Sequence, residues 1–115
     1  MSEVTEKPWG NENLIFQGFG YAVKKITLNA NQKTSLHFHE IKHETIMVHE
    51  GELRVFIDDR ISAPTTITLT SGNSLAISPE VIHQMSTGGS QAVYFEAQTD
   101  HLTDVIRLKD EYGRV

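Results

Sequence analysis

The segment HFHEIKHE, residues 37–44, places two histidines two positions apart and a glutamate five positions after the second one. If this segment begins as a β-strand, His37 and His39 point to the same face of the sheet, because strand side chains alternate with a period of two. Two imidazole nitrogens and the carboxylate of Glu44 suit a divalent first-row metal better than calcium, which prefers oxygen ligands. We expect one much later residue, His83, to complete the site.

Composition limits the classes of protein to consider. A chain of 115 residues fits one domain and can bury a core without disulfides. It contains no cysteine, so any metal must be bound through nitrogen and oxygen. The formal net charge of −5 argues against a nucleic-acid partner, and no apolar run approaches the roughly 20 residues that span a bilayer. The polar, acidic N-terminus lacks the pattern of a signal peptide, so we expect a cytoplasmic protein with no membrane partner.

Most of the chain has the pattern of short strands separated by turns. Segments rich in β-branched and aromatic residues alternate with polar segments that contain glycine, proline or asparagine. The expected strands are residues 21–28, 34–39, 44–49, 52–57, 65–69, 74–77, 83–86 and 92–98. In the first of them we expect Lys24 and Lys25 at edge or solvent positions. This pattern predicts an all-β antiparallel sandwich or barrel.

The two ends of the chain differ from this pattern. We divide the sequence into an N-terminal arm (residues 1–20), a barrel core (residues 21–100) and a C-terminal tail (residues 101–115). Residues 104–110 are compatible with either a strand or a short helix. No internal repeat, low-complexity tract or linker interrupts the sequence, so we expect a single domain.

The histidine segment resembles the first motif of the cupin superfamily, G(x)5HxH(x)3–4E(x)6G. From His37 through Glu44 to Gly51 the spacing matches this motif, while Asn31 stands in the place of the opening glycine.

The second cupin motif, G(x)5PxG(x)2H(x)3N, matches the spacing of residues 72–87 with His83 as its histidine. Ser78, Glu80 and Thr87 replace the proline, the glycine and the asparagine of the motif, and the proline has moved by one position to Pro79. The substitutions therefore fall on turn and support positions, and the histidine is kept.

The cupin resemblance implies a double-stranded β-helix, a jelly-roll barrel, in which His37, His39, Glu44 and His83 bind one divalent metal ion. Zinc, manganese, iron, cobalt and nickel are all compatible with this set of ligands. Three or four protein ligands leave at least one coordination position open, as a catalytic metal requires.

A narrower resemblance covers nearly the whole chain. Residues 7–10 (KPWG), 81–83 (VIH), 95–98 (FEAQ) and the ending 104–114 look like the cupin domain of type II mannose-6-phosphate isomerases, whose tail typically reads DDI(V/I)RxxDxYGR. The resemblance implies interconversion of mannose 6-phosphate and fructose 6-phosphate, often beside a guanylyltransferase domain, for which we expect no room here. The family commonly has glutamine where this chain has His37, so the expected site is richer in imidazole.

Glu96 and Arg107 are the first candidates for catalysis. Alternation can place Glu96 inward, where desolvation would raise its pKa and suit proton transfer; a buried carboxylate paired with an arginine is the alternative. The isomerase resemblance places Arg107 where a guanidinium would grip a sugar phosphate or steady enediolate charge. An exposed salt bridge with Asp104 or Asp110 is the alternative for Arg107.

The other candidates have weaker support. On a strand, His43 would point away from Glu44 into solvent; in a loop it could reach the pocket mouth and act as an acid or base. Arg54 reads as a solvent-facing charge, or as a substrate-binding residue if its strand lines the cavity. Trp9 is expected in the core, with a platform for a sugar ring as the alternative, and Arg114 is expected to anchor the tail.

Three functions compete for this sequence. The leading hypothesis is a metal-dependent sugar-phosphate isomerase in which Glu96 or His43 moves a proton between C1 and C2. The second is an iron-dependent dioxygenase, since three histidines and one glutamate also suit iron and oxygen chemistry. The third is a non-catalytic cupin that binds a metal and a sugar. Apolar outer faces and unprotected strand edges, together with the family resemblance, predict a homodimer.

Overall fold

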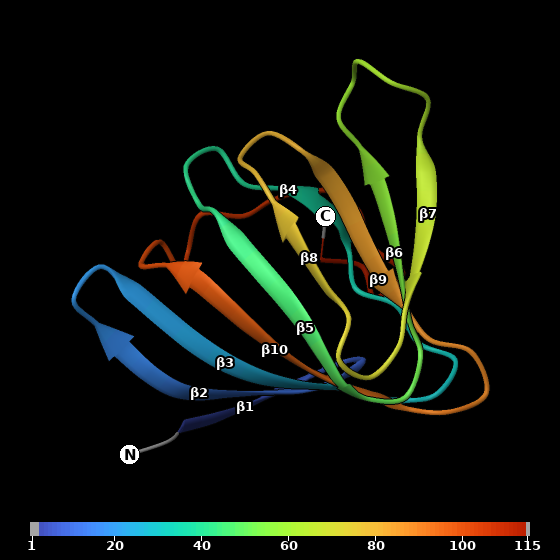
Figure 1. Cartoon of the computed structure of the whole chain (residues 1–115), viewed down its shortest axis with the longest axis horizontal. Coiled ribbons are helices and arrows are strands. Elements are labelled where there is room, and N and C mark those ends of the chain that lie inside the picture. Colours follow the sequence, from blue (N-terminus) through green and yellow to red (C-terminus); the bar gives the residue numbers. More distant parts are fainter. Residues whose placement is uncertain (1–2, 115) are drawn as a thin grey trace.

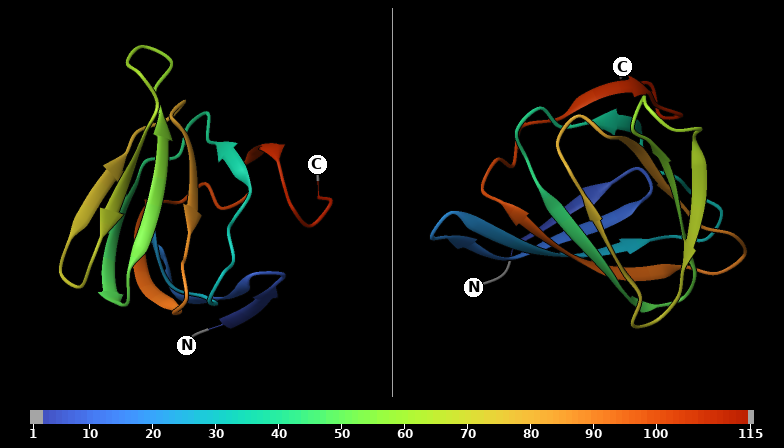
Figure 2. Two further views of the ribbon diagram at one scale, coloured as in Figure 1. Left: turned by 90° about the vertical axis from the view of Figure 1, so that its right-hand side faces the viewer. Right: turned by 45° about the horizontal axis from the view of Figure 1, so that its top comes forward.

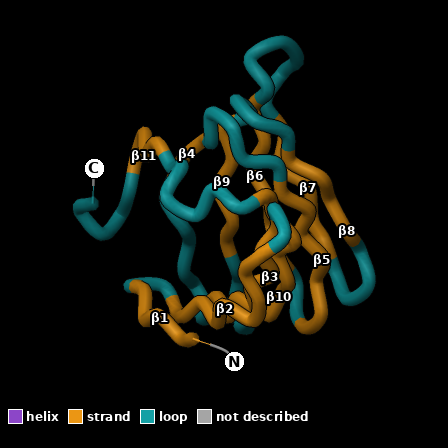
Figure 3. Tube along the Cα trace, turned by 90° about the vertical axis from the view of Figure 1, so that its left-hand side faces the viewer, coloured by secondary structure: helices purple, strands orange, loops and turns teal. Residues whose placement is uncertain are grey.

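The computed structural model describes residues 3–114, and within this range the chain forms eleven strands joined by loops, with no helix (Figure 3). In the same range there is consequently no helix long and apolar enough to cross a membrane.

The strands pair into two antiparallel sheets that face each other (Figure 1). The first sheet has the order β1 (Glu3–Lys7), β2 (Gly10–Gly18), β3 (Tyr21–Leu28), β10 (Ala92–Thr99), β5 (Glu44–Glu50) and β8 (Ser74–Ile77). The second has the order β11 (Ile106–Lys109), β4 (Leu36–Phe38), β9 (Ile82–Ser86), β6 (Leu53–Asp58) and β7 (Thr65–Leu69). The all-β jelly-roll prediction is confirmed.

Strand alternation places the core between the two sheets. In β5, Glu44, Ile46 and Val48 are buried while Thr45 and Met47 are exposed, so the apolar positions with a period of two face inward. The buried apolar cluster comprises Trp9, Ile26, Leu28, Ile46, Val48, Leu53, Val55, Leu69, Ile77, Met85, Ala92 and Tyr94. Trp9 therefore packs in the core, as expected from the sequence.

Most strands lie where the sequence predicts them, and the differences concern the ends of the chain. No strand is predicted from the sequence in the N-terminal arm, whereas the structure has β1 and β2 there, at the edge of the first sheet. The tail forms the strand β11 rather than a helix. The expectation for Lys24 is wrong: β3 is an interior strand, and Lys24 faces the cavity while Lys25 is exposed.

Three turn positions of the two motifs need a left-handed backbone. Gly51 has φ +81°, and a Cβ there would meet the carbonyl oxygen of Gln91 at 2.3 Å, so this position accepts only glycine. Asn31 and Glu80, which replace motif glycines, have φ of 57° and 71°. Both residues thus keep the backbone conformation that the motif glycines would adopt.

The two ends of the chain converge on one side of the barrel. The left view of Figure 2 shows the hairpin of β1 and β2 (blue) and the segment around β11 (red) both on the right-hand side. Residues of both segments, among them Lys7, Trp9, Arg107 and Arg114, line one internal cavity of about 230 Å³. The segments that carry the narrower family resemblance therefore enclose the space between the sheets.

Candidate metal centre

Three histidines meet inside the barrel. His37 on β4 lies opposite His83 on β9 in the register of the second sheet, and His39 follows directly after β4. One ring nitrogen from each of the three lies within 4.8 Å of the other two. Glu44, the first residue of β5, brings Oε1 within 2.9 Å of His83 Nε2 and 3.5 Å of His39 Nε2. The four predicted ligands are thus brought together, and they come from both sheets.

Hydrogen bonds fix the orientation of all three imidazole rings. His37 Nδ1 lies 2.8 Å from the carbonyl oxygen of Ser35, His83 Nδ1 lies 2.9 Å from that of Val81, and His39 Nδ1 bonds the carbonyl of Asp104. A carbonyl only accepts, so each Nδ1 carries the proton in these bonds. In the neutral ring each Nε2 then has a lone pair, which is the state in which a histidine binds metal.

Two unsatisfied buried atoms support a cation at this point. His83 Nε2 and Glu44 Oε1 are buried and have no hydrogen-bond partner, although they lie 2.9 Å apart. A lone pair on Nε2 facing a carboxylate oxygen at this distance is unfavourable, since both atoms are acceptors. A divalent cation shared by the two atoms would remove this conflict, so the residues present fit a bound metal.

Burial and charge set the protonation of the ligands. Burial, together with the neighbouring His83, lowers the pKa of His37 from 6.5 to about 3. For Glu44, burial opposes ionisation, but contacts with His39 and His83 and the charge of Lys42 hold its pKa well below the ordinary value. At neutral pH His37 is neutral and Glu44 is ionised, which are the forms that bind a metal ion.

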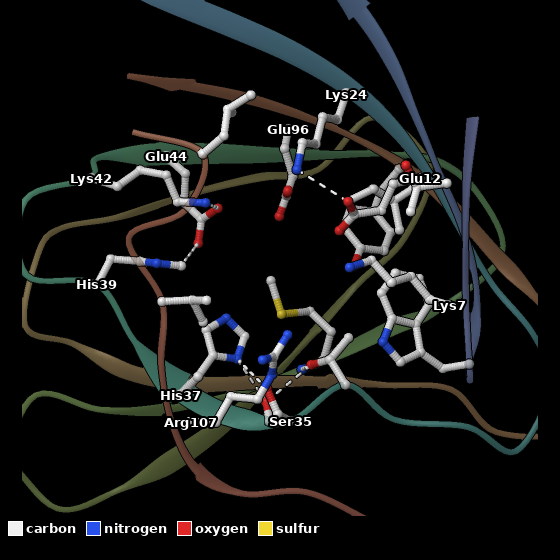
Figure 4. A pocket seen from close by; sticks show the side chains of 18 of the residues that line it. Lys7, Glu12, Lys24, Ser35, His37, His39, Lys42, Glu44, Glu96 and Arg107 are labelled. Carbon is white, nitrogen blue, oxygen red and sulfur yellow. Dashed lines mark hydrogen bonds and ion pairs between the residues drawn. The ribbon is translucent and has the colours of Figure 1, made fainter. Parts of the chain in front are cut away.

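The cavity beside this centre contains several ionisable groups, which Figure 4 shows around the histidines. Glu96, on β10, points inward and is buried, and no ion pair joins it to an arginine within residues 3–114. Burial and the charge of Glu44 raise the pKa of Glu96 well above its ordinary value. A buried carboxyl group with a raised pKa that faces the cavity is a candidate for proton transfer.

Arg107 lies beside the metal centre. In the register of β11 and β4 it is the partner of His37, and its side chain lines the cavity. Its Nε is buried without a hydrogen-bond partner, so a donor is available to a ligand. The salt-bridge alternatives do not form: Asp110 pairs with Arg114 at 2.8 Å, and the Asp104 carboxylate accepts backbone amides of residues 40–42.

The two weaker candidates lie outside the cavity. His43 is exposed and lines a shallow surface depression with Tyr21 and Thr99. Arg54 is exposed on β6, where its Nε lies 3.5 Å from Glu52. Neither residue lines the cavity beside the histidine cluster.

Lys42 is a cavity residue that the sequence did not reveal. It is buried, donates a 2.8 Å hydrogen bond to Gln98 and lies 3.9 Å from Glu44. Lys42 lies in a polar loop between His39 and Glu44, where a lysine is expected to be exposed to solvent, and nothing in the neighbouring sequence predicts its burial. Lys7 lines the same cavity, and its position could not be predicted for a similar reason, since it precedes Pro8 in a polar segment.

The two-sheet barrel with this histidine cluster is that of a cupin. Among solved structures, the chain superposes on oxalate decarboxylase from Bacillus subtilis with a TM-score of 0.83 and 15% identity, covering 93% of this chain and 30% of that one. The capsular polysaccharide assembling protein CapF from Staphylococcus aureus matches with a TM-score of 0.81 and 14% identity, covering 95% and 34%. At these identities the likeness establishes the fold.

Sequence comparison identifies the family. Residues 1–110 match the family described as mannose-6-phosphate isomerase C-terminal, and the chain belongs to it. The alginate biosynthesis protein AlgA of Pseudomonas aeruginosa is 30% identical over 112 residues, which are 94% of this chain and 22% of AlgA. The mannose-1-phosphate guanylyltransferase ManC of Salmonella typhimurium is 28% identical over 118 residues, again 22% of its length. The chain thus spans about a fifth of these curated relatives.

Proposed function

We propose that this chain is a metal-dependent cupin that binds a sugar phosphate and interconverts its aldose and ketose forms, with mannose 6-phosphate and fructose 6-phosphate as the pair. Membership of the family named after this isomerase supports the substrate class. The observation that carries the proposal is the histidine and glutamate cluster, in which each Nε2 is free to bind a metal beside a cavity with a protonatable carboxyl group.

His37, His39, His83 and Glu44 would hold the ion. A divalent metal bound there would supply Lewis-acid polarisation of the sugar carbonyl. Glu96 is the group of this chain that can move the proton, because burial raises its pKa and its side chain lines the cavity. It would take the proton from C2 of the aldose and return it to C1 of the enediol, while the hydroxyl proton moves from O2 to O1.

Arg107 would stabilise the negative charge that develops on the enediol oxygens. Its buried Nε has no partner, and it lies beside His37 rather than at the far side of the cavity. A buried cationic donor close to the developing charge stabilises it more strongly than the same group would in water. Lys42, which lies close to Glu44, would hold the carboxylate ionised and in place.

The test is an isomerase assay on protein loaded separately with zinc, manganese, iron, cobalt or nickel. We expect conversion of mannose 6-phosphate to fructose 6-phosphate that a chelator abolishes and added metal restores. Glu44→Gln should lower metal content, whereas Glu96→Gln should retain the metal and lose at least about 100-fold in kcat. Glu52→Gln, at an exposed position, is the matched control and should change neither quantity. Binding of metal and sugar phosphate with no turnover would refute the isomerase and favour a non-catalytic cupin.

An iron-dependent dioxygenase is the second candidate. The presence of histidine at position 37, which gives three imidazoles and one carboxylate, favours it. Oxygen uptake by the iron-loaded protein, measured with a panel of sugars and small acids, separates it from the isomerase. The homodimer and the cytoplasmic location expected from the sequence stay predictions.

A further inference from the structure

The cavity concentrates positive charge in a protein that is acidic as a whole. Five of the ten lysine and arginine residues line it, but only three of the fifteen aspartate and glutamate residues do, although the chain has a formal net charge of −5. The cations are Lys7, Lys24, Lys42, Arg107 and Arg114. A bound divalent metal would add further positive charge. Such a site attracts an anionic ligand.

Three of these cations already have partners in the protein. Lys24 Nζ lies 3.1 Å from Glu12, and Arg114 makes two hydrogen bonds of 2.8 and 2.9 Å to the Asp110 carboxylate. Lys42 is engaged with Gln98 and lies close to Glu44, as described above.

The other two cations have no carboxylate partner. Within residues 3–114, no ion pair joins Lys7 or Arg107 to an acidic group. Within the same range, the third acidic residue of the cavity, Glu96, makes no ion pair with either cation. An anion entering the cavity would therefore meet two uncompensated cations.

These two cations lie at different ends of the cavity. Arg107 is the strand partner of His37 and so belongs to the metal end. Lys7, the last residue of β1, reaches the cavity from the opposite side, across from His37 and His39 in Figure 4. A hexose 6-phosphate likewise has its reacting carbons at one end and its phosphate at the other.

We infer that Lys7 forms the phosphate subsite of this cupin, so that the sugar phosphate lies across the cavity with its phosphate on the β1–β2 hairpin and C1 and C2 at the histidine cluster. This inference rests on the proposed function for the class of substrate. It gives the N-terminal hairpin the role of selecting phosphorylated over free sugars, and it leaves Arg107 to serve the reacting end.

The test measures binding, so it does not depend on turnover. Titration calorimetry on zinc-loaded protein compares mannose 6-phosphate, free mannose and inorganic phosphate for the wild type, Lys7→Met and Lys7→Arg. Lys25→Met is the matched control, because Lys25 is exposed on the outer face of β3. We expect Lys7→Met to weaken the binding of mannose 6-phosphate at least about tenfold, as the loss of a hydrogen bond to a charged group does. Free mannose should be unaffected, Lys7→Arg should retain binding, and Lys25→Met should resemble the wild type.

Several results would overturn the inference. The first is an unchanged affinity of Lys7→Met for mannose 6-phosphate, and the second is an equal loss of its affinity for free mannose. The third is an equal loss of affinity in Lys25→Met, and the fourth is a wild type that binds no phosphorylated ligand. Thermal unfolding of each variant shows whether a loss reflects folding instead, and Lys7→Arg then decides whether charge at this position restores binding. Selective loss in Lys7→Met without any isomerase activity would refute the isomerase and leave the subsite standing. Isomerase activity with an unchanged KM in Lys7→Met would refute the phosphate subsite and leave the isomerase proposal standing.

Discussion

The three histidines are oriented by carbonyl groups at very different distances along the chain. His37 and His83 each donate Nδ1–H to the carbonyl two residues earlier, so their orientation is a local property of their strands. His39 instead donates to the carbonyl of Asp104, 65 residues later. Because the Asp104 carboxylate also accepts the amides of residues 40–42, one tail residue holds both the His39 ring and the loop after it.

His37 should make the metal-free protein sensitive to acid. Its pKa falls from 6.5 to about 3 on folding, first through burial and then through His83. Between these pH values the unfolded chain binds a proton that the folded chain does not, so the free energy of unfolding decreases as the pH falls. At 1.36 kcal/mol per pKa unit, the contribution lost between pH 6.5 and 4.5 is on the order of 2 to 3 kcal/mol.

The measurement is urea unfolding in chelator at pH 6.5, 5.5 and 4.5. His37→Gln, which introduces the residue common in the resembling family, should flatten the pH dependence in this window. His49→Gln, at an exposed position, is the control and should keep the wild-type slope. If the free energy of unfolding of His37→Gln depended on pH as steeply as that of the wild type, the acid sensitivity would come from other groups.

The clustering of the three histidines is the part of the candidate site that the sequence predicts, because His37 and His39 lie in one short segment and His83 falls at the spacing of the second motif. The burial of Lys42 could not be predicted, since it depends on Gln98, which lies 56 residues away on another strand. Nor could the partner of His39, which depends on how the tail packs. Residue types thus predict what can bind a metal, but the contacts that fix those residues depend on long-range pairing.

At the level of elements, turns and edge strands mark the limits of prediction. The central strands alternate apolar and polar residues, as β5 does, and were predicted within one or two residues. β1 was missed because four of its five residues are exposed and no buried stripe reveals it. β2 was missed because its inward positions near the cavity, such as Glu12, are polar. An element that lines a polar cavity lacks the hydrophobic periodicity that identifies a strand.

Glu80→Gly should stabilise the protein. Glu80 is exposed and has φ +71°, in the turn where the cupin motif has glycine. A left-handed conformation costs a non-glycine residue roughly 1 to 2 kcal/mol, and part of the gain is offset because glycine has more freedom in the unfolded chain. We expect a net increase of about 0.5 to 1 kcal/mol in the free energy of unfolding, measured with urea.

Glu80→Ala is the control for this substitution, because it removes the same charge but retains a Cβ. It should give no increase in stability. The Glu80 amide donates a 2.7 Å hydrogen bond to the carbonyl of His39, so the turn of the second motif also supports a ligand of the first. If Glu80→Gly and Glu80→Ala changed stability equally, charge rather than backbone strain would be the cause.

At the level of the whole molecule, the candidate metal site lies between the two sheets. His37 and His83 belong to the second sheet, and Glu44 belongs to the first. In this structure their facing acceptors, His83 Nε2 and Glu44 Oε1, are buried without hydrogen-bond partners at the sheet interface. A bound cation would convert this unfavourable contact into a cross-link, so binding at the site and the stability of the barrel should be coupled.

Metal binding should therefore raise the midpoint of thermal unfolding. Free metal at 100 times its Kd stabilises the folded state by about 2.7 kcal/mol. For a chain of this size, that corresponds to an increase in Tm on the order of 10 °C. Scanning calorimetry in chelator and in zinc should show this difference for the wild type. Glu44→Gln keeps the shape of the side chain but removes the anion that joins the sheets, so its Tm should respond much less to zinc. Equal midpoints in chelator and zinc, with zinc bound to the wild type by metal analysis, would mean that zinc binds the unfolded chain as tightly as the folded one, so that folding does not create the site.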